Sequence, residues 1–262
     1  MSSDVSFQNG YADINGLRMY YEMYGEGDLP LVLIHGGGST IQTTFGNIIP
    51  YLAKNRKIIA MELQAHGRTN DRNAPLSFQQ DADDIAALLL YLQINIADFI
   101  GFSNGGQTLI ELALRHPGVI NKMIICSAFY KREAVSEAFW NGFDNVHLAM
   151  MPKALRNGFL AVNNHQEALQ NSFDKDVQRM KHFKGWSDEQ IQSIKKPTLI
   201  IHGNNDVGSI EHTVKMYRTM PNAGLVILPG VHGEYLGATE ALENNIWLQT
   251  YTVGIVETFL NK

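Results

Sequence analysis

The stretch FIGFSNGGQTLIELALRHP, residues 99–117, joins an apolar run to a helical pattern through a serine set among three glycines. Glycines weaken regular structure, so their clustering at one joint needs a physical reason. The segment GFSNG at 101–105 matches G-x-S-x-G between a strand and a helix, which is the setting of a nucleophile elbow. In such a turn the serine backbone is strained, and the flanking glycines avoid collisions with neighbouring chain. The stretch therefore predicts a Ser103 hydroxyl presented at the carboxyl edge of a sheet, with a plain glycine-rich turn as the alternative.

Apolar runs and helical patterns alternate along most of the chain. A hairpin is predicted at 12–25, where Asn15 and Gly16 separate two β-like runs. Further strands are predicted at 29–38, 56–63, 96–102, 119–129, 196–206 and 223–230. Helices are predicted at 77–93, 106–117 and 244–262. Strands that alternate with helices imply right-handed crossovers and a mostly parallel sheet flanked by helices.

Residues 130–190 interrupt this alternation. The segment contains no clear strand and many phenylalanine, methionine and tryptophan side chains. It is interpreted either as an ordinary helical insertion with its own small core or as a cap over a pocket, and we favour the cap. The chain is accordingly divided into a core at 1–129 and 191–262 and a helical cap at 130–190.

The composition excludes several classes of protein. The 262 residues are 45% hydrophobic and 18% charged, enough for a sizeable core and unlike a disordered chain. A formal net charge of −5 argues against a nucleic-acid-binding protein, which would carry a basic surface. No apolar run approaches the roughly 18 residues of a membrane span, and the polar segment at 1–10 does not resemble a secretory signal. With Cys126 as the single cysteine, these features predict a cytoplasmic protein without disulfides, a membrane span or a nucleic-acid partner.

A second glycine cluster, IHGGGST at 34–40, follows the first buried run. Glycines there let backbone N–H groups approach a negatively charged oxygen. We expect the N–H of Gly37 to be one donor, with Gly38 as the second choice, and the N–H of Asn104 to be the other donor. A phosphate-binding loop would need Lys-Ser/Thr after the glycines or a G-x-G-x-x-G pattern, and the sequence has neither.

The partners of the serine are sought further along the chain. A serine hydroxyl needs a base that an acid orients, and after a nucleophile elbow the chain order is serine, acid, histidine. Asp206 ends one predicted strand and His232 follows the last one, so both should reach the sheet edge that carries Ser103. Glu234 is the rival acid, but it lies too near His232 in sequence to orient the imidazole easily.

The other histidines are expected to have structural or surface positions. His35 and His202, each followed by glycine at a strand end, are expected to pack loops. Five more lie in helical or inserted segments and are expected to be solvated: His116, His147, His165, His182 and His212.

These residues together resemble the α/β-hydrolase superfamily, in its lipase- and esterase-like branch. The similarity runs from NGLRMYYEMYG at 15–25 to the last predicted helix and is weakest at 130–190. The segment PGVH at 229–232 departs from the commoner G-A-G-H or G-T-G-H of the family, but it retains the histidine.

The segment ELQAHGRTND at 62–71 is similar to the D-x-x-G-H-G-R-S loop of the family. Three conservative replacements distinguish it from that pattern: Glu62 for Asp, Ala65 for Gly and Thr69 for Ser. We take Glu62, His66 and Arg68 as structural residues of this loop.

The resemblance implies an α/β-hydrolase fold with a helical cap inserted after the sixth strand. A serine in the elbow argues against the epoxide hydrolases and haloalkane dehalogenases of the superfamily, which use an aspartate nucleophile. The resemblance implies a hydrolase with the triad Ser103, Asp206 and His232. Such an enzyme would cleave a small, largely apolar carboxylic ester through an acyl-enzyme, without cofactor or metal. A carbon–carbon bond hydrolase, a cofactor-free haloperoxidase-like member and a non-catalytic ligand-binding protein remain alternatives. The expected partner is a small-molecule substrate, and a homodimer stays open.

Overall fold

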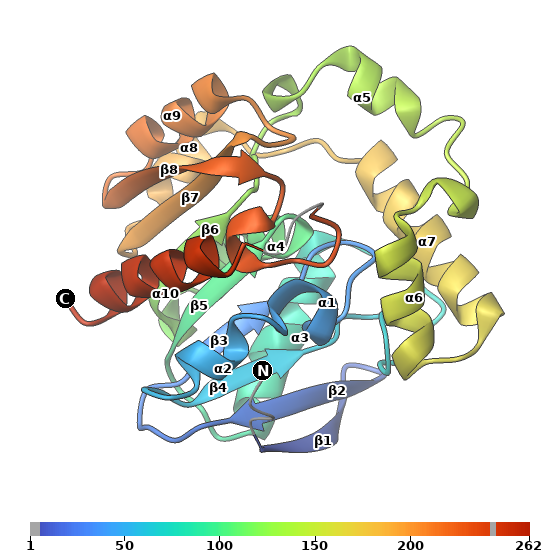
Figure 1. Ribbon diagram of the computed structural model, residues 1–262, viewed down its shortest axis with the longest axis horizontal. Helices are drawn as coiled ribbons and strands as arrows, with labels where there is room; N and C mark the ends of the chain where they lie inside the picture. Colours follow the sequence, from blue (N-terminus) through green and yellow to red (C-terminus); the bar gives the residue numbers. More distant parts are fainter. Residues whose placement is uncertain (1–5, 242–244) are drawn as a thin grey trace.

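A computed structural model describes residues 6–241 and 245–262 of the chain. Residues 1–5, the start of the polar segment considered above, and 244, where the last predicted helix begins, lie outside the described residues. The described strands form one sheet in the order β1-β2-β4-β3-β5-β6-β7-β8 (Figure 1). Their bounds are β1 Phe7–Ile14, β2 Leu17–Tyr24, β3 Leu31–Ile34, β4 Ile58–Met61, β5 Ala97–Phe102, β6 Ile120–Cys126, β7 Thr198–Asn205 and β8 Ala223–Val231.

The sheet is parallel except at one edge. The pairs β1–β2 and β2–β4 are antiparallel, and every other pair is parallel. Asn15 and Gly16 form the hairpin turn with φ of 45° and 78°, the left-handed conformation that an Asn-Gly turn provides. The central strands β3, β4 and β5 are buried along their whole length, because helices cover both faces of the sheet.

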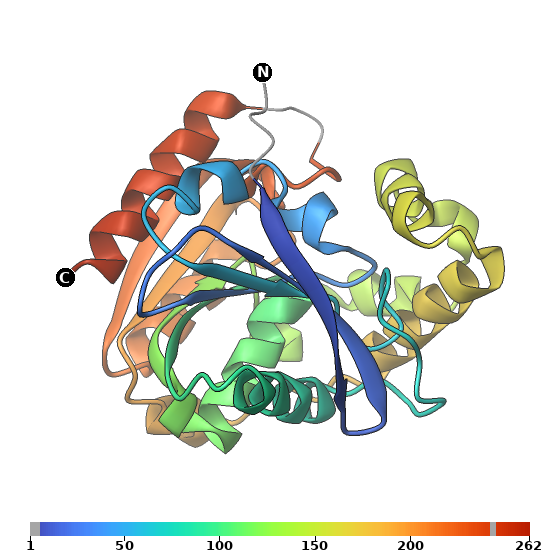
Figure 2. The same cartoon turned by 90° about the horizontal axis from the view of Figure 1, so that it is seen from below.

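Helices cover the sheet on both sides (Figures 1 and 2). On one face, residues of α1, α2 and α10 belong to the same apolar cluster as Leu31 and Leu33, and on the other, residues of α3, α4, α8 and α9 belong to the same cluster as Val32 and Ile34. The alternation of β3 side chains between two apolar clusters follows from the two-residue period of a strand. The bounds of these helices are α1 Ile41–Phe45, α2 Ile49–Leu52, α3 Phe78–Tyr91, α4 Asn104–Arg115, α8 Asp188–Ser193, α9 Ile210–Thr219 and α10 Ile246–Leu260.

A helical insertion follows β6 and precedes β7. The insertion contains the helices α5 Glu137–Gly142, α6 Lys153–Val162 and α7 Gln166–Lys181. Helix α8 follows them, and its Ile191 belongs to the same apolar cluster as Val32 and Ile34. Both views place α6 and α7 on the side of the molecule away from α10. Phe159 and Phe173 belong to a separate apolar cluster within this insertion. The predicted fold class, with a mostly parallel sheet and a helical insertion after the sixth strand, is confirmed.

Within the described ranges, no helix combines the length and the apolar character that crossing a membrane requires.

Candidate active site

The serine of the opening stretch lies in a strained turn between β5 and α4. Ser103 has φ 53° and ψ −122°, a conformation that a residue with a side chain rarely adopts. A Cβ atom at Gly101 would lie 2.3 Å from the carbonyl oxygen of Gly105, and one at Gly105 would lie 2.2 Å from that of Ile34. Glycine is therefore required on both sides of Ser103, because backbone atoms occupy the space that any side chain would need.

Asp206 and His232 lie next to each other at the ends of β7 and β8. Nδ1 of His232 and Oδ1 of Asp206 are 2.5 Å apart. Burial disfavours the charged form of each group, but their mutual attraction outweighs it. The pKa of the Asp206 carboxyl is consequently held below its usual range, and the pKa of His232 is raised above its usual value. Glu234, the rival acid, instead accepts the N–H of Val231 at 3.0 Å.

A cavity of about 500 Å³ brings the predicted residues together. Ser103, His232, Gly37, Gly38 and Asn104 all line it. Most of the other walls are apolar side chains, many of them from the insertion: Phe129, Phe139, Phe143, Val146, Met150, Met151, Pro152, Leu155, Phe173, Val177, Met180 and Val207. Among the described residues that line the cavity there is no lysine or arginine.

The two candidate oxyanion donors of the glycine loop have different surroundings. The N–H of Gly38 already donates to Oδ2 of Asp176 at 2.6 Å. The N–H of Gly37 donates no hydrogen bond within the described chain. Asn104 is the first residue of α4, where the backbone N–H has no acceptor within the helix. Gly37 and Asn104 thus have N–H groups available at the cavity, whereas that of Gly38 is already used.

Asp176, which the sequence did not single out, lines the same cavity from α7. Its Oδ2 lies 2.8 Å from Nε2 of His66, and Nδ1 of His66 lies 2.8 Å from the carbonyl oxygen of Gln64. Nδ1 carries hydrogen, because a carbonyl oxygen only accepts; Nε2 lies 3.3 Å from the N–H of Gly38 as well, but its shorter contact with the carboxylate favours hydrogen on this nitrogen and thus the imidazolium form of His66. Burial alone would lower the pKa of His66, but the charge and the hydrogen bond of Asp176 raise it overall.

Arg179 extends this network to the core. Its guanidinium binds Oδ1 of Asp176 and lies 2.7 Å from Oδ2 of Asp81 in α3. Burial raises the pKa of Asp81 to about 6, although Arg179 opposes that shift. Burial would likewise raise the pKa of Asp176, but the charges of His66 and Arg179 hold it below its usual range. No sequence pattern indicates this network, because Asp176 and Arg179 look like ordinary surface charges of a helix.

Ser127 and Tyr235 form a chain of hydroxyl contacts that ends at the carboxylate of Asp206. The hydroxyl of Ser127 donates to Oδ2 of Asp206 at 2.5 Å and lies 2.7 Å from the hydroxyl of Tyr235. Because Ser127 gives its single hydrogen to the carboxylate, the contact with Tyr235 needs the hydrogen of the Tyr235 hydroxyl, and the carbonyl oxygen of Ile201 at 3.2 Å is a second acceptor for that hydrogen. Ser127 follows β6 directly and has φ 50°. Its position at the carboxyl end of a strand is the signal that could have identified it.

The remaining histidines include one incorrect expectation. His35 and His202 pack loops by hydrogen bonds to the backbone of Gly36 and Gly208. His212, expected to be solvated, is only 5% exposed, and its Nε2 accepts the N–H of Tyr130 at 3.3 Å. Burial lowers the pKa of His212 to about 4. The expectation was wrong because α9 turns this face toward the sheet rather than toward solvent.

No group of three or more histidine, cysteine, aspartate or glutamate side chains in residues 6–241 and 245–262 is placed to hold a metal ion.

Comparisons with known proteins agree with this architecture. The family described as alpha/beta hydrolase fold matches residues 30–182. The chain is 27% identical to the serine hydrolase BPHL of Homo sapiens over 202 residues, which covers 74% of this chain and 68% of the relative. It is also 27% identical over 215 residues to the 2-hydroxymuconate semialdehyde hydrolase of Pseudomonas sp. (strain CF600), covering 73% and 75% of the two chains. Among solved structures, a meta-cleavage product hydrolase from Pseudomonas fluorescens IP01 has the same fold, with a TM-score of 0.79, 23% identity and 98% of each chain covered.

Proposed function

The chain belongs to the α/β-hydrolase fold family, and from that premise we propose that it is a serine hydrolase that cleaves a small, neutral, largely apolar carboxylic ester. One observation carries the proposal. Ser103 and His232 line a single cavity, and the second ring nitrogen of His232 is held by the buried carboxylate of Asp206. This is the arrangement that activates a serine hydroxyl for attack on a carbonyl carbon.

The proton transfers follow from the tautomer of His232. Because Nδ1 donates to Asp206, neutral His232 has its lone pair on Nε2. Nε2 takes the proton of Ser103 as the oxygen attacks the ester carbonyl, and it gives that proton to the leaving alcohol. Water then attacks the acyl-enzyme with the same base, releasing the acid and restoring Ser103. Asp206 stabilises the imidazolium that forms in each half of the reaction.

Two backbone donors face the charge that develops. The tetrahedral intermediate places a negative charge on the former carbonyl oxygen, and preorganised N–H groups stabilise it. Gly37 and Asn104 are the proposed donors, since neither N–H has an acceptor among the described residues. The N-terminal end of α4 adds a favourable dipole at the same place.

The cavity walls favour an uncharged acyl group. The lining is mostly apolar, and among the described lining residues the only charged side chain besides a protonated His232 is the carboxylate of Asp176. An anionic acyl group would enter without a cationic partner and would lose its hydration, which is costly.

A carbon–carbon bond hydrolase is the second candidate. The similarity to the hydroxymuconate semialdehyde hydrolase and to the meta-cleavage product hydrolase favours it. A muconate-type substrate is an anion, however, and the described part of this cavity offers no lysine or arginine to bind one. We therefore place the neutral ester first.

The mechanism is tested with a fluorophosphonate probe, which reacts with activated serines. We expect the wild-type protein to be labelled, and Ser103→Ala and His232→Ala to lose labelling to below about one thousandth of the wild-type rate. Circular dichroism of each variant checks that the fold is kept. Labelling of folded Ser103→Ala at the wild-type rate would place the nucleophile elsewhere, and no labelling of the folded wild type would favour a non-catalytic ligand-binding protein.

The substrate class is tested with two esters of matched length. We expect kcat/KM for p-nitrophenyl butyrate to exceed that for the mono-p-nitrophenyl ester of succinate by at least about tenfold, because only the second carries a carboxylate. Equal values would contradict a neutral acyl pocket. Efficient cleavage of 2-hydroxy-6-oxohexa-2,4-dienoate with poor cleavage of both esters would move the second candidate to first place.

A further inference from the structure

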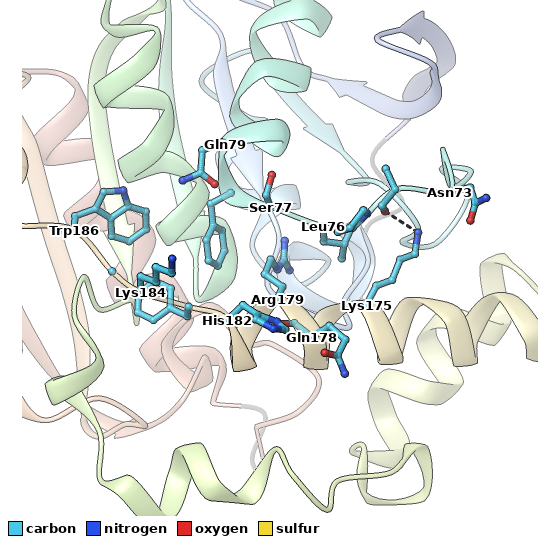
Figure 3. A pocket seen from close by; sticks show the side chains of 15 residues that line it. Asn73, Leu76, Ser77, Gln79, Lys175, Gln178, Arg179, His182, Lys184 and Trp186 are labelled. Carbon is cyan, nitrogen blue, oxygen red and sulfur yellow. Dashed lines mark hydrogen bonds between the residues drawn. The ribbon is translucent and has the colours of Figure 1, made fainter.

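A second cavity, of about 730 Å³, lies on the other side of α7 (Figure 3). It is enclosed by the segment 73–79, the C-terminal half of α7 and the segment 182–186. It shares no lining residue with the cavity that contains Ser103. The helix separates the two: Phe173, Asp176, Val177 and Met180 face the Ser103 cavity, and Lys175, Gln178, Arg179 and His182 line the second one.

The second cavity has a basic lining. Figure 3 shows Lys175 and Arg179 on α7, His182 directly after this helix and Lys184 farther along the chain. No aspartate or glutamate is among its described lining residues, although the chain as a whole has a net charge of −5. Lys175 and Arg179 have carboxylate partners just outside the lining, so the positive charge open to an anion is that of Lys184.

Two of these basic groups have donors without a partner. Lys175 is engaged by Asp71 and by the carbonyl oxygen of Ala74. Lys184 is exposed and forms no hydrogen bond or ion pair with the described residues. Arg179 is 5% exposed, and its Nε–H is buried without an acceptor. A buried donor left unpaired is costly, and a bound carboxylate could supply the missing acceptor.

The rest of the lining is apolar and aromatic. Leu76 and Pro75 lie on the loop before α3, and Phe78, Phe183 and Trp186 contribute rings. The indole N–H of Trp186 is already bonded to Glu111 at 2.5 Å, so what remains for a ligand is its ring. Aryl and alkyl groups pack well against such rings.

We propose that this second cavity binds an amphipathic carboxylate, an organic anion with a single negative charge and an aryl or alkyl body. One lysine without a counter-ion and one unpaired guanidinium N–H match one carboxylate, and the ring-lined wall accommodates the apolar body. The volume lies within the range of pockets that bind small organic molecules. This proposal does not depend on the reaction at Ser103.

The test is calorimetric titration of the full chain with 4-phenylbutanoate. We expect one molecule to bind per chain, and we expect the neutral analogue 4-phenylbutan-1-ol to bind at least about tenfold more weakly because it lacks the charge. Lys184→Glu should weaken binding of 4-phenylbutanoate by at least about tenfold, and Lys184→Gln should weaken it less. The matched control is Lys195→Glu, the same charge reversal at an exposed lysine outside both cavities, which should leave binding unchanged.

Lys184 is chosen over Arg179 because Arg179 also holds Asp176 and Asp81, so its loss would disturb the core. Thermal melts of the three variants show that they are folded. Unchanged binding in Lys184→Glu would assign the ligand to another site and overturn the proposal. Equal affinity for the acid and the alcohol, or no binding of the acid by the folded wild-type protein, would overturn it as well.

Discussion

The histidines around the two glycine loops differ in charge because their ring nitrogens meet different partners. His35 donates from Nδ1 to the carbonyl of Gly36 and accepts the N–H of Leu63 at Nε2, so it is neutral, and burial lowers its pKa to about 3. His66 has the carbonyl of Gln64 at Nδ1 and the carboxylate of Asp176 at Nε2, and this carboxylate raises its pKa and favours the charged form. His232 has one nitrogen fixed by Asp206, which leaves the other for proton transfer. The hydrogen-bond partners of the ring nitrogens therefore determine the protonation state that each of these three histidines favours.

The first prediction concerns Asp206→Asn. The neutral imidazole of His232 is the base, so activity falls as pH drops through the pKa of His232, which lies above its usual value of 6.5. Burial acts to lower that pKa and Asp206 acts to raise it, so removing the carboxylate moves the acid limb of kcat/KM to lower pH. The rate at optimal pH should fall by about 10³- to 10⁴-fold, because the amide can also stabilise the wrong tautomer. Both effects are read from the pH profile of ester hydrolysis.

Glu234→Gln is the matched control for that experiment. It also removes a carboxylate close to His232 in sequence, but its side chain bonds to the backbone of Val231. It should keep the acid limb in place and change the rate by less than about tenfold. If Glu234→Gln moved the limb and Asp206→Asn did not, the assignment of the acid would be reversed.

The residues of the site were predictable to different degrees. Ser103, Asp206 and His232 could be proposed from the sequence because each follows a strand and their order is fixed. The structure places Asp206 against His232 and gives Ser103 and His232 a common cavity; their catalytic roles remain predictions. Asp176 could not be proposed, since its significance depends on contacts with His66 and Gly38, both more than a hundred residues away.

In the turn between β5 and α4, neighbouring backbone atoms exclude a side chain at either of the glycines Gly101 and Gly105. We predict that Gly105→Ala lowers the free energy of unfolding by roughly 3 kcal/mol or more, because the added Cβ would lie 2.2 Å from the oxygen of Ile34 and 2.5 Å from that of His35. Both atoms belong to the backbone of a buried segment and cannot move aside. Chemical denaturation measures the effect.

Gly254→Ala is the control within a regular helix. Gly254 lies inside α10, and a Cβ there would meet nothing within 4 Å. Alanine should raise the free energy of unfolding by about 0.5–1 kcal/mol, because glycine is the weaker helix former. Similar effects of both substitutions would show that the collision at Gly105 is relieved by a shift of the chain.

Helix α7 serves both cavities because its two faces carry different side chains. Phe173, Val177 and Met180 face the Ser103 cavity at helical spacing, whereas Lys175, Gln178 and His182 line the second cavity. The pattern of large side chains in the insertion correctly indicated helices. It could not indicate which face meets a cavity, because that depends on how the insertion packs on the core.

At the scale of the molecule, the buried charges of Asp176, His66, Arg179 and Asp81 join the insertion to the core. We predict that Asp176→Asn lowers the free energy of unfolding by about 3 kcal/mol near pH 6, since it leaves buried positive charges without their carboxylate. It should also lower kcat/KM, because Asp176 holds the N–H of Gly38 next to the oxyanion donor. Denaturation curves and steady-state rates measure the two effects.

The pH dependence of that difference has a definite sign. The folded-state pKa of Asp176 is depressed, so its contribution is present above about pH 4 and is lost as the pH falls. The folded-state pKa of His66 is raised, so its contribution is complete below about pH 6.5 and is lost as the pH rises through the raised value. The difference between wild type and Asp176→Asn should therefore be largest between about pH 4 and 6.5 and smaller in alkaline solution.

Asp174→Asn is the control on the same helix. Asp174 is exposed and, in the part of the chain that the structure describes, bonds only to Gln170, so its replacement should change the free energy of unfolding by less than about 0.5 kcal/mol at every pH. A difference for Asp176→Asn that is equally small, or that grows as the solution becomes alkaline, would contradict the pairing of Asp176 with a charged His66.

The sequence by itself determined the order of strands and helices, the joint at Ser103 and the three strand ends that supply Ser103, Asp206 and His232. These features depend on neighbours in the chain: the two-residue period of strands, the 3.6-residue period of helices and the local collisions that require glycine. Only the tertiary structure decided that Asp176 binds the glycine loop, that Ser127 supports Asp206 and that α7 separates two cavities. Those features depend on side chains distant in sequence that meet in a buried environment, where each unpaired polar group is costly and the available partner fixes its charge.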